Sequence, residues 1–473
     1  LDDYTVQYTL TAPVPYFESF LVTEIFLPNH KEFSDQCGTK FGTSPDQLLY
    51  CGAYVLQSWQ RNKEFVMVKN ENYYDADKVS VEKIVLQKIT DGAATVEMFK
   101  RGELTGTSLT GDQVEHYMQD PEWGQYVTLR DKSSVNFWFF PNFESPNSEF
   151  NAFVQNEDFR LALYHALDRV TIAQLYNPYD TEDMLTNLIC PEDVCYDENG
   201  IDYTDYAPLK EIKERGAATY DPALAKEYFE KALSAVTDGS GNIRGASAGE
   251  VKMGRTFSFQ TDGKLPLQLV YVHGASSDEV SMAQIIKMNL EEVFGSENIE
   301  VILSQFTGDK YNDVIAPGNF DFAYDNYSFK YADPLSQLDR LTTGGAVNDG
   351  RSSLPQFDAL VKEASEKLVA SERYELFAQA EGMLINGGYI IPWESGGGTY
   401  GMTREIPFTA PRPVPTMMAV GVALVSPASS IRACSFPKSP SRPSSTSSWK
   451  MSSMSSCSRE MPADTPPYRY KGW

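Results

Sequence analysis

Basic residues and histidines are scarce in this chain. Its 473 residues include 40 Lys and Arg against 65 Asp and Glu, a formal net charge of -25, and only 4 His. Nucleic acids are bound through clustered Lys and Arg, so this acidic balance excludes them as expected partners. The histidines lack the spacing of metal ligands, and no HExxH motif occurs. The sequence therefore predicts no metal ion, no cofactor and no catalytic residue.

Long apolar runs are missing as well. A membrane-spanning helix needs about 20 apolar residues, and the longest candidate, at residues 416–425, is too short. The chain begins at Leu1 in strand-like sequence, without the basic and apolar regions of an export signal. We therefore expect the beginning of a domain, with any signal peptide, to precede this sequence in the complete protein.

The six cysteines fall into three local pairs. The disulfide candidates are Cys37 with Cys51 and Cys190 with Cys195, while Cys434 and Cys457 lie near the C-terminal end. Cys190 and Cys195 bracket a turn that contains proline, and a disulfide there would suit an oxidising exterior. Unpaired thiols remain open. A metal site is the weaker alternative, because this C-x4-C spacing has no second Cys or His pair nearby.

Strand and helix patterns alternate through much of the chain. Residues 267–272 have strand character, 279–294 helical periodicity and 299–304 strand character again, which is the βαβ order of an α/β lobe. The other expected strands are at 54–56, 65–68, 84–89, 135–140, 320–324 and 389–392. The other expected helices are a segment ending before Pro28, 96–101, 157–175 and 372–386.

The composition changes abruptly from about residue 412 onward. The segment is rich in Ser and Pro, basic instead of acidic and without periodicity. Such sequence cannot bury enough apolar surface to offset the entropy of ordering it. We therefore expect residues 412–473 to be disordered or to derive from a shifted reading frame.

Five sequence blocks, in the same order, resemble those of the family 5 extracellular solute-binding proteins of ABC importers. They are CGAYVLQSW (51–59), KNENYYDADKV (69–79), RGEL (101–104), NEDFRLALYHALDR (156–169) and YADPLSQLD (331–339). The resemblance covers about residues 1–410. It implies a two-lobed α/β clamp like that of periplasmic binding proteins (type II, cluster C-like), with mixed sheets flanked by helices and, here, an incomplete first lobe.

The resemblance also implies a division of the chain. Residues 1–50 would be the remainder of an accessory domain, 51–138 part of the first lobe, 139–395 the second lobe and 396–411 the return to the first lobe. Within the fourth block, we expect Arg160, Asp168 and Arg169 to form a structural charge network and a helix cap rather than a ligand site.

Ligand contacts are expected mainly in and around the fifth block. In the family, the acidic residue that opens this block holds the ammonium group of a bound peptide, but here the position is occupied by Lys330. Lys330 could pair with Asp325 or Asp333, or it could face the ligand and favour an anionic group. The full set of expected ligand contacts is Trp138, Phe139, Tyr327, Phe329, Lys330, Tyr331, Asp333, Trp393, Glu394 and Tyr400.

By this resemblance the protein is the extracytoplasmic substrate-binding component of an ABC importer and not an enzyme. It would capture short peptides by hinge closure and deliver them to the transmembrane permease subunits. We expect a monomer that touches the membrane only through a lost N-terminal lipid anchor. The alternatives are a non-peptide cargo, such as a sugar, a metal chelate or an anionic solute, and a secreted hydrolase.

Overall fold

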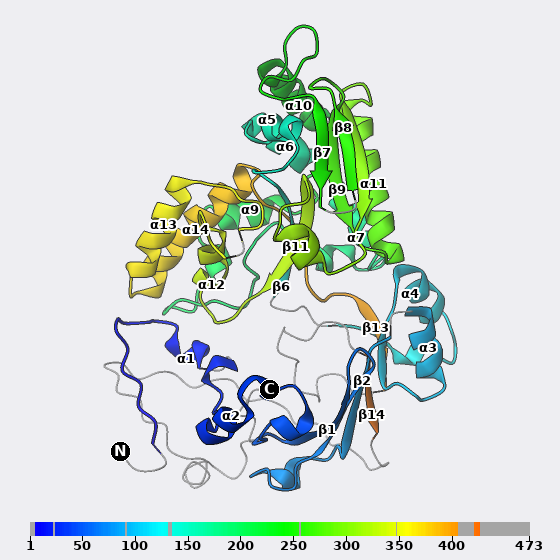
Figure 1. The fold of residues 1–473 in the computed structure, drawn as a ribbon, viewed down its shortest axis with the longest axis vertical. Coiled ribbons are helices and arrows are strands. Elements are labelled where there is room, and N and C mark those ends of the chain that lie inside the picture. Colours follow the sequence, from blue (N-terminus) through cyan, green and yellow to red (C-terminus); the bar gives the residue numbers. More distant parts are fainter. Residues whose placement is uncertain are drawn as a thin grey trace. The chain divides into compact units, whose positions relative to one another are not determined.

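The chain divides into two compact units (Figure 1). Unit 1 contains Leu1–Ser108 and Met402–Trp473, and unit 2 contains Leu109–Gly401. The computed structural model describes residues 5–21, 24–89, 92–130, 135–254, 257–346, 348–404 and 421–425. In these residues no helix has the length and apolar character needed to cross a bilayer.

Unit 1 contains a four-stranded antiparallel sheet in the order β1-β2-β3-β14. Its elements are α1 (Phe17–Phe20), α2 (Lys31–Cys37), β1 (Tyr54–Gln60), β2 (Glu64–Lys69), β3 (Lys83–Gln87), α3 (Gly92–Lys100), β4 (Gly106–Ser108) and β14 (Gly421–Val425). Val and aromatic residues favour β1 and β2. Asn62, at a φ of 59°, makes the turn that joins them. The expected strands in this region are confirmed.

Two expectations about the ends of the chain are wrong in part. The helix expected to end before Pro28 is reduced to the short α1, since Pro13 and Pro15 interrupt the segment. Residues 421–425, expected to be structureless, form β14 and pair with β3. Unit 1 also includes residues 1–50, which the sequence assigned to a separate accessory domain. The remainder of the tail, 426–473, lies outside the described residues.

Unit 2 is built on a mixed five-stranded sheet in the order β10-β9-β11-β6-β12. The strands are β6 (Val135–Pro141), β9 (Leu267–His273), β10 (Ile299–Gln305), β11 (Phe322–Ser328) and β12 (Ile391–Ser395). β9 and β10 are parallel and are joined through α11 (Ser277–Phe294), which confirms the expected βαβ unit. β6 is antiparallel to both β11 and β12.

The two units divide the chain at positions that differ from the expected lobe boundaries, which stay a prediction. A boundary between residues 138 and 139 would cut through β6, whose two neighbours in the sheet both belong to unit 2. At the other end, the unit continues beyond residue 395 as far as Gly401. There the carbonyl oxygen of Gly398 accepts a hydrogen bond of 2.6 Å from Asn177. The chain crosses between the units twice, as the resemblance implied, but near residues 108 and 402.

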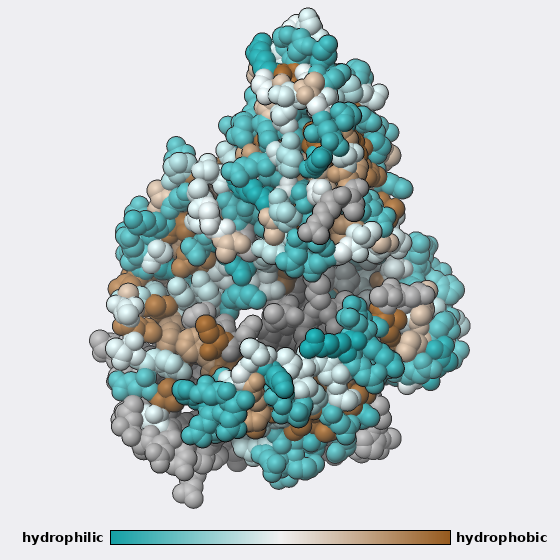
Figure 2. All heavy atoms as spheres, viewed as in Figure 1, coloured by the Kyte–Doolittle hydropathy of each residue, from teal (hydrophilic) through white to brown (hydrophobic). Residues whose placement is uncertain are grey.

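Helices surround this sheet in groups (Figure 1). They are α4 (Gly111–Met118), α5 (Ser148–Val154), α6 (Glu157–Ala166), α7 (Arg169–Gln174), α8 (Thr181–Met184), α9 (Leu209–Arg215), α10 (Pro222–Val236), α12 (Leu335–Leu338), α13 (Pro355–Glu366) and α14 (Ala370–Asn386). The remaining strands are β5 (Val127–Leu129), the hairpin of β7 (Gly249–Met253) with β8 (Phe257–Thr261), and β13 (Tyr400–Thr403), which crosses the unit boundary. α5, α6 and α10 pack together, as do α12, α13 and α14. Hydrophilic side chains cover most of the face over α10, β7 and β8 in Figure 2.

The expected helix at 157–175 is interrupted in its middle. Asp168 accepts a hydrogen bond of 3.1 Å from the Thr171 amide and caps the separate helix α7. Arg160 donates to the carbonyl oxygen of Gly387 at 2.8 Å. Gly388 follows with a φ of 65°, and a Cβ there would lie 2.8 Å from Arg160. The prediction that Asp168 forms a helix cap and Arg160 a structural contact is confirmed.

Candidate functional site

Five of the ten expected ligand contacts lie on three neighbouring strands of unit 2: Trp138, Phe139, Tyr327, Trp393 and Glu394. Tyr327 on β11 lies opposite Asn136 on β6, and Glu394 on β12 lies opposite Phe137 on β6. Lys330 and Tyr331 follow β11 directly. Residues almost 200 positions apart in the chain are therefore close in one sheet.

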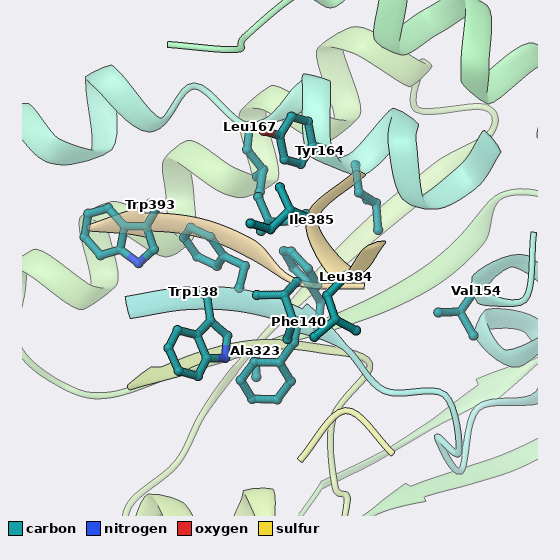
Figure 3. Close-up of a cluster of buried hydrophobic side chains, with 14 of the residues drawn as sticks. Trp138, Phe140, Val154, Tyr164, Leu167, Ala323, Leu384, Ile385 and Trp393 are labelled. Carbon is teal, nitrogen blue, oxygen red and sulfur yellow. The ribbon is translucent and has the colours of Figure 1, made fainter. Parts of the chain in front are cut away.

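Several of the expected contacts lie in the hydrophobic core rather than at a surface. These buried residues are Trp138, Phe139, Phe329, Trp393 and Tyr400. Trp393 packs against Phe139 at a ring distance of 5.8 Å, whereas Trp138 packs against Tyr327 at 6.1 Å. Neighbouring residues of a strand point to opposite faces, and the two tryptophans accordingly lie on either side of β6 (Figure 3). A direct contact of these five residues with a ligand stays a prediction.

Asp333 is held in a buried ion pair. Its two carboxylate oxygens accept hydrogen bonds from Arg373 on α14, at 3.1 Å from Nε and 2.7 Å from Nη2. Asp333 is 3% exposed and Arg373 is 0% exposed. Burial raises the pKa of Asp333, and the arginine opposes that shift. This pair connects the segment before α12 to α14, so Asp333 has a structural role whether or not it also contacts a ligand.

Asp325 is paired as well. The ammonium group of Lys310 lies 3.8 Å from its carboxylate, donates a 2.5 Å hydrogen bond to the carbonyl oxygen of Tyr324, and is 3.9 Å from the centre of the Tyr324 ring. Burial lowers the pKa of Lys310 and raises the pKa of Asp325. Lys310 was not singled out from the sequence, where nothing links it to the strand 15 positions later.

Lys330 therefore has neither of the partners considered for it. Asp325 is paired with Lys310 and Asp333 with Arg373, and the Lys330 ammonium group forms no ion pair with any residue that the structure describes. Its backbone amide donates to the Ser336 hydroxyl at 2.8 Å, which fixes the main chain at this position. The side chain is partly exposed. The hypothesis that Lys330 forms a structural ion pair with Asp325 or Asp333 is wrong.

Glu394 is the acidic counterpart of this unpaired lysine. Its carboxyl group has no hydrogen-bond or ion-pair partner among the described side chains and backbone groups. The residue is partly accessible to solvent, yet surrounding protein atoms desolvate the carboxyl group and raise its pKa to about 8. An isolated carboxyl group in this setting gains most from an incoming cation.

A second acidic group lies behind Tyr327. The Tyr327 hydroxyl donates a hydrogen bond to the carboxylate of Asp349, and burial raises the pKa of Asp349 to about 6. The guanidinium group of Arg340 lies 5.2 Å from the centre of the Tyr327 ring. Asp349 also lines a small pocket beside Trp138 and Phe140. Asp349 and Arg340 were missed from the sequence, since neither belongs to a motif.

The cysteine candidates are all free thiols in the structure. Cys190 and Cys195 are buried, Cys37 is partly exposed and Cys51 is exposed. The Cys190 thiol donates a hydrogen bond to the buried carboxylate of Glu381. Unpaired thiols, the alternative left open by the sequence, are what the structure contains. Cys434 and Cys457 lie outside the described residues.

Metal binding and one hydrolase motif can be compared with the described residues. No group of three or more His, Cys, Asp or Glu side chains there could hold a metal ion. One segment, GASAG at 245–249, fits the letters of the G-x-S-x-G hydrolase motif and was missed from the sequence. That motif requires a tight turn from a strand into a helix, whereas Ser247 is an exposed residue just before β7.

Comparison with known proteins agrees with the fold. The family model described as bacterial extracellular solute-binding proteins, family 5 Middle, matches residues 1–349. The oligopeptide-binding protein SarA of Streptococcus gordonii is 27% identical over 452 residues, covering 87% of this chain and 66% of SarA. A dipeptide-binding protein of Lactococcus lactis subsp. cremoris is 26% identical over 392 residues, covering 81% of this chain and 64% of that protein.

Solved structures show the same architecture. The peptide-bound OppA of Listeria monocytogenes superposes with a TM-score of 0.64 at 20% identity, over 84% of this chain and 68% of that one. The Escherichia coli murein tripeptide-binding protein MppA gives 0.62 at 20% identity, over the same shares of the two chains. The present chain thus spans about two thirds of the length of the proteins it resembles.

Proposed function

The chain belongs to the family 5 bacterial extracellular solute-binding proteins, and from this premise we propose that it captures short peptides as the substrate-binding component of an ABC importer. The observation that supports this most is the family match over residues 1–349, together with relatives named as oligopeptide- and dipeptide-binding proteins. The proposal includes an extracytoplasmic location, a monomer and a transmembrane permease as partner. It includes no catalytic step.

The site in unit 2 suits a ligand that carries both charges and apolar groups. Lys330 offers a positive charge, and Glu394 offers a carboxyl group that becomes negative by releasing its proton when a cation binds; no described residue pairs with either side chain. Tyr327 and Tyr331 are partly exposed aromatic residues close to Lys330 in the chain. Aromatic side chains provide a large apolar contact with few directional demands, which allows a binding protein to accept different peptide side chains.

The unpaired Lys330 also supports a second candidate, an anionic solute that is not a peptide. An ammonium group without an ion-pair partner attracts any carboxylate or phosphate. An anionic solute would leave the Glu394 carboxyl group without a cationic partner. We therefore rank it below peptide.

Thermal unfolding of the full-length gene product with added ligands tests the proposal. A ligand present at about 100 times its Kd stabilises the folded protein by about 2.7 kcal/mol, which is a measurable shift in Tm. We expect unmodified tri- to pentapeptides to produce this shift. If sugars, metal chelates or phosphorylated solutes raise Tm and no peptide does, the cargo is not a peptide.

A further inference from the structure

Lys330 and Glu394 are the starting point for a more specific inference, which rests on the proposed function. Both side chains are partly exposed, and neither is paired with a described residue of the chain. We propose that they hold the two ends of one peptide, with Lys330 on the C-terminal carboxylate and Glu394 on the N-terminal ammonium group. The peptide would then run opposite to the direction implied by the family's acidic residue at the position of Lys330.

The surroundings of Lys330 explain why its partner must come from outside. Its nearest acidic candidates are already neutralised, Asp325 by Lys310 and Asp333 by the doubly hydrogen-bonded Arg373. An incoming anion would therefore not have to displace a partner from the Lys330 ammonium group. The Lys330 backbone amide donates a hydrogen bond to the Ser336 hydroxyl, which fixes the main chain from which the side chain starts.

Glu394 is fixed just as firmly on its own strand. β12 pairs with β6, with Glu394 opposite Phe137, and a second backbone bridge joins Glu394 to Leu185. Its carboxyl group nevertheless lacks a hydrogen-bond donor among the described residues. An ammonium group supplies up to three donors and the opposite charge. The sheet therefore fixes the main chain at Glu394, and the hydrogen bond to Ser336 fixes the main chain at Lys330.

The position of β6 between the two strands sets the minimum length of the ligand. Glu394 lies opposite Phe137 on β6, which lies opposite Asn326 on β11, so Glu394 and Asn326 are two sheet spacings apart, or roughly 10 Å at about 4.8 Å each. Lys330 lies four residues further along the chain, beyond the end of β11. An extended chain advances by about 3.3–3.6 Å per residue. A free amino acid is too short to reach both groups, whereas a peptide of about three or more residues can.

Blocking the peptide termini one at a time tests this assignment. Titration calorimetry would compare a tetrapeptide in four forms: unmodified, N-acetylated, C-amidated and blocked at both ends. We expect C-amidation to weaken binding to the unaltered protein at least tenfold, and to have little effect on Lys330→Gln. N-acetylation should likewise weaken binding to the unaltered protein and have little effect on Glu394→Gln. Measuring the affinity of each variant for each blocked peptide gives, as in a double-mutant cycle, the coupling free energy between a residue and a peptide terminus.

Matched substitutions on α13 serve as controls. Lys362→Gln and Glu366→Gln remove the same charges from exposed positions and should leave all four affinities unchanged. Circular dichroism and Tm would establish that each variant folds. If C-amidated and unmodified peptides bind the unaltered protein equally, the assignment of Lys330 is overturned while the proposed function stands. If none of the four forms binds but other solutes do, the proposed function itself fails.

Discussion

Arg373 and Asp333 form an ion pair with two hydrogen bonds in the interior of unit 2, where the arginine is completely buried. Arg373 also donates to the carbonyl oxygens of Ala364 and Lys367, at 2.9 and 3.1 Å. One guanidinium group thus joins α14 to the end of α13 and to the segment before α12.

Removing this arginine should destabilise the protein strongly. Arg373→Met leaves the Asp333 carboxylate buried without a counter-ion, and breaking a buried pair in this way costs about 3–5 kcal/mol. Urea denaturation measures the loss. The control Lys231→Met breaks an exposed ion pair with Glu227 on α10 and should have no measurable effect. An equal loss in both variants would contradict a special role for the buried pair.

Asp321 should make unit 2 less stable as the pH rises. It is fully buried, accepts hydrogen bonds from Asn147 and from the Val270 amide, and burial raises its pKa from 3.8 to about 7. Between these values the folded state holds a proton that the unfolded state has released, so stability falls with pH. The loss is on the order of 4 kcal/mol at 1.36 kcal/mol per pH unit. Denaturation between pH 4 and 7 should show this decline, and the decline should be smaller by about this amount in Asp321→Asn, where the other buried carboxyl groups still contribute.

The affinity for peptides with a free amino terminus should rise between pH 6 and 7. The pKa of Glu394 is about 8 in the unliganded protein, so its carboxyl group must release a proton when it binds an ammonium group. Affinity should then increase about tenfold over that pH unit. Titration calorimetry of Glu394→Gln, or of an N-acetylated peptide, should show no such increase. A flat profile for the unaltered protein would indicate that Glu394 does not hold the ammonium group.

An acidic residue at position 330 should change which peptide terminus matters. In Lys330→Asp, we expect that C-amidation no longer lowers the affinity for the peptide. N-acetylation should lower the affinity more than it does in the unaltered protein, because the position then attracts an ammonium group. Binding assays with the two blocked peptides measure the change. Lys362→Asp, on the exposed side of α13, should keep the preferences of the unaltered protein. Unchanged preferences in Lys330→Asp would mean that the residue does not contact the ligand.

Thiol labelling should distinguish the buried cysteines from the exposed one. Iodoacetamide should modify Cys51 in the folded protein, and should modify Cys190 and Cys195 only after unfolding, because both thiols are buried and burial raises their pKa. Mass spectrometry of peptides counts the labels. If Cys190 and Cys195 react after unfolding only when a reductant is added, they form the disulfide that the sequence suggested.

Local sequence patterns predicted much of the fold but little of the site. The βαβ unit of β9, α11 and β10 could be predicted because each element carries its own hydrophobic periodicity. The place of β6 in the sheet of unit 2 could not be predicted locally, because its partners lie far along the chain. No local sequence pattern predicts the pairing of Lys310 with Asp325. Only when this pair is known does it follow that Asp325 is not the partner of Lys330. Motifs identified the segment, and long-range contacts determined which of its charges are unpaired.

The place of β6 in the sheet also bears on how unit 2 is assembled during synthesis. Its last residue is Pro141 and its partner β12 begins at Ile391, so 250 positions separate them. Until those residues have been made, β6 has an unpaired edge and the core around Trp393 cannot close. Such distant pairings are slow to form, and an open strand edge invites association with other chains. A nascent chain that ends before residue 391 is therefore expected to depend on chaperones, because only the last strand completes the sheet.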